Sequence, residues 1–323
     1  MAVVSYREAL NQALAEEMER DERVFLLGEE VAFYEGSYKV TKGLLAKFGP
    51  ERVRDTPIAE EVIAGSAIGS ALGGLRPVAE MMTVNFMLLA MDQIVNHAAK
   101  IRYMFNGQTS LPLVIRTPQG AGKQLGAQHS QQLESYVCHC PGLIVLAPAT
   151  PADAKGLLKT AIRDENPIIF LENQNLYGVK GEVPEGEHLV PIGRANITRT
   201  GADVTMIAYS NTVYLAEKAA EQLASEDISV ELIDLRTLHP LDMDTILQSV
   251  AKTHRVVIVS EAWRTGNLAA EIAMQIQEAA FDELDAPILR VTAKDVPMPY
   301  SRDLEQAALP QVADIIAAVK QIV

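Results

Sequence analysis

The stretch GLIVLAPATPADAKGLLKTAIRDENPIIFLE, residues 142–172, contains the pattern that decides the fold. It begins and ends with short apolar runs, residues 142–148 and 167–172, which are typical of strands buried on both faces of a sheet. Residues 150–166 between them have the pattern of a helix capped by Thr150. A strand, a helix and a strand in this order predict a mainly parallel sheet covered by helices.

The same alternation extends in both directions from this stretch. Toward the N-terminus, the first 20 residues predict an acidic amphipathic helix and residues 85–102 predict a long helix. Further strands are predicted at residues 23–28, 76–82, 111–118, 203–209, 228–235, 255–261 and 287–292. Further helices are predicted at residues 212–224, 242–252, 267–279 and 310–322.

The pattern breaks once, between residue 173 and about residue 199. This segment is rich in Gly, Pro and Glu, which is typical of a connector. We therefore expect two α/β domains of unequal size, residues 1–185 and residues 186–323.

The composition is that of a soluble globular chain, with 48% hydrophobic and 22% charged residues. A net charge of -14 disfavours nucleic acid or an anionic membrane as the main partner. No run reaches the roughly 20 apolar residues that span a bilayer, and the N-terminus lacks the features of a signal or transit peptide. We expect a cytoplasmic protein whose Cys138 and Cys140 are reduced and partly buried rather than zinc ligands or a disulfide.

A second stretch, RDTPIAEEVIAGSAIGSALGG at residues 54–74, raises a chemical question. Asp55 and Thr56 offer cap oxygens, and Pro57 suits a first helical position. Glu60 and Glu61 then open an apolar helix, and neighbouring helical residues are about 100° apart, so one carboxyl can face water while the other points inward. Both could be first-turn acids that the helix dipole stabilises, or one could do chemistry at the edge of an apolar pocket.

Two α/β domains invite a nucleotide site, but the sequence lacks the motifs for one. There is no Walker-type phosphate loop, no G-x-G-x-x-G, no Gly-Asp-Gly element for magnesium diphosphate and no metal-spaced pair of histidines. If the chain handles a phosphorylated cofactor, another chain must therefore hold the phosphates. Among the histidines, His129 is the candidate for function, because it lies in a Gly-rich loop after an apolar strand, where α/β folds keep their sites.

Seven segments together resemble the beta subunit of the pyruvate dehydrogenase component of the 2-oxoacid dehydrogenase complexes. The resemblance covers essentially the whole chain in order. The segments are DTPIAE, GLRPVAEMMTVNF, GAQHSQ, CPGLIVLAP, DAKGLLKTAIRDENPIIFLEN, LIDLRTLHPLD and DVPMPY. It implies a pyrimidine-binding domain of the thiamine diphosphate type with a parallel sheet, followed by a transketolase C-terminal-like α/β domain.

The resemblance also implies a division of labour in an α2β2 heterotetramer. The alpha subunit would hold Mg²⁺ and the diphosphate, and this chain would surround the aminopyrimidine ring of thiamine diphosphate. Glu60 would hydrogen-bond the pyrimidine ring nitrogen, and His129 would bind the reaction intermediate or the incoming lipoyl sulfur. The remaining cofactor residues implied by the motifs are Glu29, Ile58, Met82 and Phe86. A structural K⁺ site would fall on Leu113, Ala161, Ile162, Asp164 and Asn166, mostly through backbone oxygens.

The implied activity is oxidative decarboxylation of pyruvate and transfer of the two-carbon fragment to a lipoyl group, on the route to acetyl-CoA. The C-terminal domain would dock onto the dihydrolipoyl acetyltransferase core. One alternative is the beta subunit of a branched-chain 2-oxoacid or acetoin dehydrogenase, with the same fold and a different substrate pocket. The other is a non-catalytic scaffold subunit, which would have no need of Glu60, Phe86 or His129.

Overall fold

The computed structural model describes all residues, 1–323, and the chain forms two compact units. The first unit comprises Met1–Gln119 and Tyr136–Ile192, and the second comprises Gly120–Ser135 and Gly193–Val323. Residues 120–135 therefore group with the second unit although strands of the first unit flank them in the sequence. The domain boundary expected at residues 185 and 186 stays a prediction.

The first unit is built on a parallel sheet. Its strands are β2 (Val24–Gly28), β3 (Val53–Asp55), β4 (Arg76–Glu80), β5 (Leu113–Gln119), β6 (Ile144–Leu146) and β7 (Pro167–Asn173). They lie in the order β6-β7-β5-β4-β2-β3, and every neighbouring pair is parallel. All residues of β2, β4, β5 and β7 are buried, as expected for strands covered by helices on both faces.

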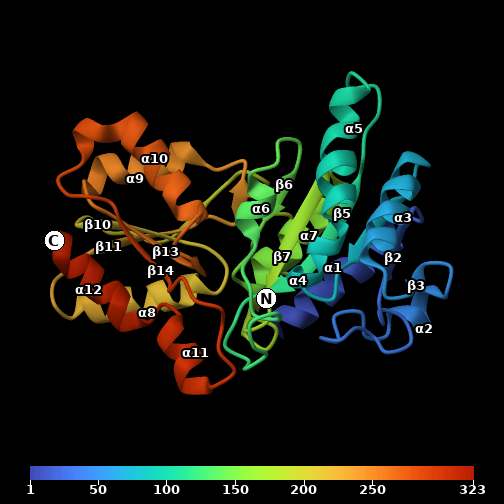
Figure 1. The fold of residues 1–323 in the computed structure, drawn as a ribbon, viewed down its shortest axis with the longest axis horizontal. Helices are drawn as coiled ribbons and strands as arrows, with labels where there is room; N and C mark the ends of the chain where they lie inside the picture. The colour runs from blue at the N-terminus through green and yellow to red at the C-terminus, as the bar shows by residue number, and fades with distance from the viewer. The chain divides into compact units, whose positions relative to one another are not determined.

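The main helices of this unit are α1 (Tyr6–Arg20), α3 (Glu60–Leu72) and α7 (Pro151–Arg163), with the shorter α2 (Leu44–Phe48). The short α6 (Glu134–Cys138) begins in residues of the second unit and ends in residues of the first. Thr150 caps α7 as predicted, because its hydroxyl accepts the Asp153 backbone N–H at 3.1 Å. The helix predicted over residues 85–102 is interrupted. It consists of α4 (Val84–Met87), a 3₁₀ turn (Leu88–Ala90), a π-helix (Asp92–Ala98) and α5 (Ala99–Met104), which leads away from the sheet in Figure 1.

Two strands of the first unit correct the sequence-based prediction. Residues 2–5 form β1 (Ala2–Ser5) instead of the start of a helix, and β1 pairs antiparallel with β8 (Lys180–Val183). The composition of residues 173–199 predicts a connector, so β8 at residues 180–183 is a correction. Helix α1 begins only after Ser5, whose hydroxyl and Glu8 form a capping box. The pairing partner is more than 170 residues away, so the local pattern could not indicate this strand.

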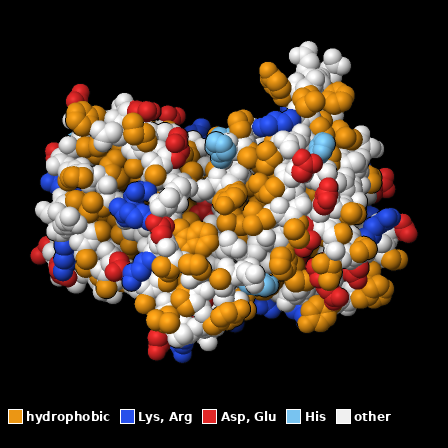
Figure 2. Space-filling view, viewed as in Figure 1, with side chains coloured by type: hydrophobic (Ala, Val, Ile, Leu, Met, Phe, Trp, Pro, Cys, Tyr) orange, Lys and Arg blue, Asp and Glu red, His pale blue; other side chains and the backbone are white.

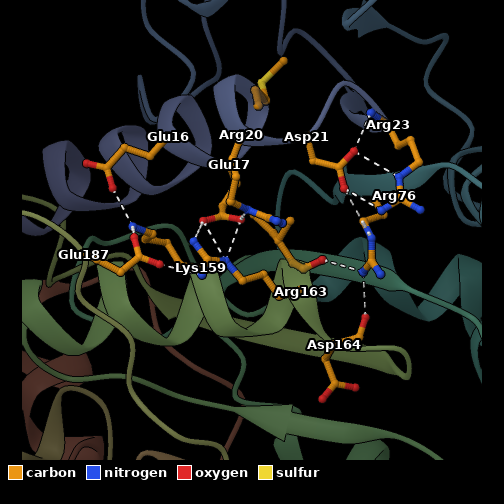
Figure 3. A network of polar contacts seen from close by, with 12 residues as sticks. Glu16, Glu17, Arg20, Asp21, Arg23, Arg76, Lys159, Arg163, Asp164 and Glu187 are labelled. Atoms are coloured by element: carbon orange, nitrogen blue, oxygen red, sulfur yellow. Dashed lines mark hydrogen bonds and ion pairs between the residues drawn. The ribbon is translucent and has the colours of Figure 1, made fainter.

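A buried charge network joins α1 to α7 (Figure 3). Arg163 of α7 donates from Nη2 to Glu17 of α1 at 2.6 Å, and Lys159 donates to Glu16 at 2.8 Å. Glu187 accepts from Lys159 at 2.7 Å and pairs with Arg163 at 2.5 Å, so the network also holds the segment after β8. Because Glu17 and Lys159 are buried, their charges are stable there only as pairs.

The second unit contains a mixed sheet in the order β14-β13-β10-β11-β9. The strands are β9 (Asn196–Arg199), β10 (Val204–Ala208), β11 (Val230–Asp234), β13 (Val256–Trp263) and β14 (Leu289–Ala293), and only β9 is antiparallel to its neighbour. A short strand, β12 (Thr237–His239), follows β11. Strand β9 lies in residues 173–199, which the sequence predicted to be a connector, so this prediction is wrong for β9 as well as for β8.

The helices of the second unit match the predicted positions. They are α8 (Thr212–Ala224), α9 (Met243–Thr253), α10 (Leu268–Ala280) and α12 (Val312–Ile322), and α11 (Arg302–Ala308) was not predicted. Figure 1 shows them around the sheet of this unit. None of the helices in the chain combines the length and the apolar character that crossing a membrane requires.

Candidate functional site

Helix α3 begins at Glu60, three residues later than Pro57, where the sequence predicted its first position. The cause is Asp55, whose carboxylate accepts the backbone N–H groups of Ala32 at 2.7 Å and Phe33 at 3.2 Å instead of capping a helix. The capping residue is Ala59, which has no side-chain oxygen. The first helical position therefore falls on Glu60 itself.

The two adjacent glutamates have opposite environments, as the helical geometry predicted. Glu61 is exposed, whereas Glu60 retains only 6% of its accessible surface. No hydrogen bond or ion pair within the chain involves the Glu60 carboxyl group, although hydrogen bonds hold most other buried acids. Burying an unpaired carboxyl group is costly, so Glu60 is suited to a partner from outside the chain.

A second acid lies near Glu60. Glu29 directly follows β2, and burial together with the negative charges of Glu60 and Glu30 raises the pKa of its carboxyl group. Glu29 and Glu60 thus lie within electrostatic range of each other. Paired acids in a partly buried place are typical of functional sites rather than of a solvated surface.

The other cofactor residues implied by the motifs lie at the same edge of the sheet. β4, β2 and β3 are neighbouring parallel strands, so the residues that follow them meet at one edge. Met82 and Phe86 follow β4 and are half-buried, and Ile58, which follows β3, is 75% exposed. The structure thus brings Glu29, Glu60, Met82 and Phe86 to one region, and Ile58 borders it from the surface.

Sequence reasoning missed two polar residues in this region. The side-chain oxygens Thr56 Oγ1 and Asn85 Oδ1 are buried without a hydrogen-bond partner. Asn85 Nδ2 donates to Thr83 Oγ1 at 2.6 Å, which orients the amide and leaves its oxygen unpaired. Buried polar atoms normally have partners, so these two oxygens are further evidence of a polar ligand. Only their position beside Glu60 and Phe86 in the sequence could have indicated them.

The structure also brings together the residues of the expected K⁺ site. Ala161 and Ile162 lie in the last turn of α7, Asp164 is its C-cap and Asn166 follows, while Leu113 lies opposite Pro167 in the β5–β7 pair. Backbone carbonyls at a helix C-terminus carry partial negative charge and suit a cation.

A guanidinium group already contacts two of these carbonyls. Arg76 Nη1 donates to the backbone oxygens of Ile162 at 3.0 Å and Asp164 at 3.1 Å, and Arg76 also pairs with Glu165 (Figure 3 shows Arg76 beside Asp164). A carbonyl oxygen has two lone pairs, so each retains one further acceptor position. The donor set fits a monovalent cation next to a resident positive charge.

His129 belongs to the second unit and is exposed, whereas Glu60 belongs to the first. Its loop, residues 120–135, is turned by residues in the left-handed region, Gly120, Gly122, Gln124 and Gly126. The chain contains no group of three or more His, Cys, Asp or Glu residues placed to hold a metal ion. Cys138 and Cys140 carry free thiols, the first half-buried and the second buried.

Comparison with known proteins relates both units to one enzyme superfamily. Residues 2–180 match the family "Transketolase, pyrimidine binding domain", and residues 193–315 match "Transketolase, C-terminal domain". The solved structure of a split gene transketolase, an inactive beta4 tetramer, superposes with a TM-score of 0.83 at 25% identity, over 99% of this chain and 98% of that one.

Curated relatives narrow this assignment. The pyruvate dehydrogenase E1 component subunit beta of Rhizobium meliloti is 52% identical over 323 residues, 100% of this chain and 70% of the relative. The mitochondrial pyruvate dehydrogenase E1 component subunit beta of Bos taurus is 50% identical, over 98% of this chain and 90% of the relative. The pyrimidine-binding domain implies thiamine diphosphate as cofactor, and a beta subunit implies an alpha subunit. The chain belongs to the family of beta subunits of the pyruvate dehydrogenase E1 component.

Proposed function

We propose that the region around Glu60 is the pyrimidine wall of the pyruvate dehydrogenase active site. The observation that carries this proposal is the buried, unpaired Glu60 carboxyl group at the carboxyl edge of a parallel sheet. A ring nitrogen of the aminopyrimidine would complete it by sharing one proton with the carboxyl group. Exclusion of water strengthens such a hydrogen bond and raises the cost of a bare charge.

The neighbouring residues fit the shape and chemistry of that ring. Phe86 and Met82 supply half-buried apolar surface for a flat heterocycle, and Ile58 closes the region from the outside. Glu29, whose pKa is raised, sets the electrostatic environment of Glu60. The unpaired oxygens of Thr56 and Asn85 would accept from polar hydrogens of the cofactor or of the partner subunit.

Thiamine diphosphate, when bound, supplies the carbanion chemistry that releases carbon dioxide from a 2-oxo acid. This chain holds and orients the ring, keeps water away and moves a proton at the Glu60 carboxyl group. His129 would hydrogen-bond the bound two-carbon fragment or the lipoyl sulfur that receives it. Pyruvate is thereby decarboxylated and the lipoyl group is reductively acetylated.

The alpha subunit would supply what this chain lacks. No cluster of acids is placed to hold Mg²⁺, so Mg²⁺ and the diphosphate would be bound by the alpha subunit of an α2β2 heterotetramer. Large exposed apolar side chains, which a partner commonly covers, lie on and beside α3: Ile58, Val62, Leu88 and Leu89. Others lie at the end of α5, where Figure 2 shows hydrophobic side chains at the surface: Tyr103, Met104 and Phe105.

Three finer expectations complete the proposal. The second domain, residues 186–323, would dock onto the dihydrolipoyl acetyltransferase core, and a chain with net charge -14 suits a basic partner there. K⁺ would bind the carbonyls at the end of α7 beside Arg76. The protein would work in the cytoplasm; its relatives include bacterial proteins and proteins named mitochondrial.

The test replaces Glu60 by Gln in the assembled α2β2 enzyme. Glu60→Gln should abolish hydrogen–deuterium exchange at the thiazolium carbon of the bound cofactor, because the proton-sharing carboxyl group is gone, while the assembly stays intact by size-exclusion chromatography. Glu61→Gln is the matched control, since it changes the adjacent, exposed carboxyl group on the same helix, and it should exchange at the wild-type rate. An unchanged rate in Glu60→Gln would refute the assignment.

A further inference from the structure

The loop that carries His129 is fixed to the second unit by two buried carboxylates. We call residues 120–135 the His129 loop. At its start, the Ala121 backbone N–H donates to Glu261 Oε1 at 2.9 Å. The N–H groups of Gly122, at 2.8 Å, and Gln124, at 3.2 Å, both donate to the carboxylate of Glu305. The loop therefore depends on acceptors that lie about 140 and 180 residues away in the sequence.

Glu305 is the less usual of the two acids. It lies in α11 and has 0% of its surface exposed, and no Lys or Arg pairs with it. A carboxylate in such a place is stable only if N–H groups surround it. The His129 loop supplies them, because Gly122 and Gln124 have positive φ angles of 96° and 57°. The turn that these residues form directs two backbone N–H groups, those of Gly122 and Gln124, toward the same carboxylate.

A second contact fixes the loop closer to His129, at Gly126. The ring of Tyr300 lies against Gly126, where an added Cβ would be 2.3 Å from the ring. The Gly126 carbonyl accepts the backbone N–H of His129 at 3.3 Å. The loop is thus held at Gly122 and Gln124 by Glu305 and at Gly126 by Tyr300, and His129 is attached directly to the second of these points.

We propose that Glu305 is a positioning residue for His129 in the transfer of the two-carbon fragment to the lipoyl group. This inference rests on the role of His129 in the proposed function. Glu305 Oε1 accepts from both N–H groups, and Oε2 accepts a second time from Gln124. A glutamine that keeps its oxygen at the Oε1 position would turn its NH₂ donor toward the Gln124 N–H donor. Substitution by Gln would therefore weaken the anchor at Gln124 and shift His129. A misplacement of about 1 Å can cost on the order of 100-fold in rate.

The experiment compares four α2β2 enzymes: wild type, Glu305→Gln, His129→Ala and the double variant. The readout is the steady-state rate of reductive acetylation of a free lipoyl domain. Glu305→Gln should lower kcat about 10- to 100-fold, with little change in KM for the lipoyl domain. The double variant should be no slower than His129→Ala alone, because a residue that acts through His129 adds nothing once the imidazole is absent.

Two further readouts separate positioning from general damage. Hydrogen–deuterium exchange at the thiazolium carbon, which depends on Glu60, should keep its wild-type rate in Glu305→Gln. Trypsin should cut more rapidly after the exposed Lys123 inside the loop. Asp303→Asn is the matched control, because it changes an exposed acid on the same helix, and it should behave as wild type in every assay. If Glu305→Gln does not assemble, Glu305→Asp, which keeps the charge but shortens its reach, provides the same comparison.

The outcomes distinguish the inference from the function on which it rests. Wild-type reductive acetylation in Glu305→Gln, or losses that multiply in the double variant, would overturn the inference alone. Wild-type reductive acetylation in His129→Ala would mean that the proposed role of His129 is wrong, and the inference would be lost with it. Slow transfer in both single variants without a further loss in the double variant supports the inference.

Discussion

Arg116 is a fully buried positive charge in the first unit. Its side chain is 2% exposed, and its guanidinium group lies between two buried carboxylates, donating to both oxygens of Glu172 at 2.7 Å and pairing with Glu80. The Tyr177 hydroxyl also donates to Glu172 at 2.6 Å, and burial with that negative charge raises the pKa of the phenol well above its usual value. All four groups depend on one another, since none is solvated.

Replacing Arg116 by Met should therefore destabilise the protein strongly. Two carboxylates would remain buried without their cation, and breaking a buried pair costs about 3–5 kcal/mol in the free energy of unfolding. Urea denaturation followed by circular dichroism measures this loss. The control is Arg54→Met, which removes an exposed pair with Glu51 and should cost at most about 1 kcal/mol. Equal effects of the two variants would contradict the interdependence described for Arg116.

Asp21 gives the stability a dependence on acid pH. Hydrogen bonds from Arg23 lower the pKa of its carboxyl group from 3.8 to about 2 in the folded chain. The folded state thus binds this proton less readily than the unfolded state, so the stabilisation is complete above about pH 4 and is lost as the pH falls toward 2. Unfolding free energies of wild type and Asp21→Asn should therefore differ most above pH 4 and converge toward pH 2. A constant difference would disprove this account.

At the residue scale, the sequence could predict which neighbouring side chains of a helix lie on different faces, because the helical period determines this. Because consecutive helical residues lie on different faces, it predicted that one of Glu60 and Glu61 could face water while the other points inward, and in the structure Glu61 is exposed and Glu60 is buried. The choice of Glu60 came from the resemblance and not from the helix period. The sequence could not predict the partners of Arg116 or Glu305, since 56 residues separate Arg116 from Glu172 and 183 separate Gly122 from Glu305. Those contacts arise only from the way the strands and helices come together. The sequence predicted Asp55 as a helix cap, which is wrong, because the N–H groups that donate to its carboxylate lie 22 and 23 residues earlier in the chain.

At the scale of elements, the regular parts of both sheets were predictable and the edge pairings were not. Helix α8 has the predicted bounds, Thr212–Ala224, because its apolar positions recur with the helical period between clear turns. β1, β8 and β9 are short strands with mixed burial, and they gain their structure from antiparallel partners distant in the sequence. The π segment at Asp92–Ala98 was also missed, since it has the same apolar pattern as an α-helix.

The contact between α5 and the turn before β6 gives an element-scale prediction. Gly142 has φ of 104°, and an added Cβ would lie 1.9 Å from the backbone oxygen of Ala99, the first residue of α5. Gly142→Ala combines backbone strain with overpacking, and should lower the free energy of unfolding by about 3 kcal/mol or more. Gly107→Ala is the control, because Gly107 has φ of 72° with nothing within 4 Å. Gly107→Ala should lower the free energy of unfolding only by the backbone strain, about 1–2 kcal/mol. Thermal denaturation of the two variants measures the difference.

At the scale of the whole molecule, the proposed function gives this chain half of a cofactor site. The chain contains the buried Glu60 and the apolar side chains that we propose for a heterocycle, but no phosphate-loop motif and no group of three or more acids, His or Cys placed to hold a metal ion. Large apolar side chains on α3, on the 3₁₀ turn and at the end of α5 are exposed in the single chain. The family and the fold class were therefore recognisable from the sequence, whereas the geometry contributed by the partner subunit was not, because no residue of this chain encodes it.

This incompleteness predicts how the isolated chain binds its cofactor. Thiamine diphosphate carries most of its charge on the diphosphate, and under the proposed function this chain would offer only the contacts to the pyrimidine ring. Isothermal titration calorimetry with thiamine diphosphate and Mg²⁺ should therefore detect weak binding or none to the chain alone, and tight binding after the alpha subunit is added. Thiamine without phosphates is the control, since losing the diphosphate should matter little to the isolated chain and greatly to the assembly. Tight binding by the isolated chain would require a phosphate site within it and would refute the division of the cofactor between two subunits.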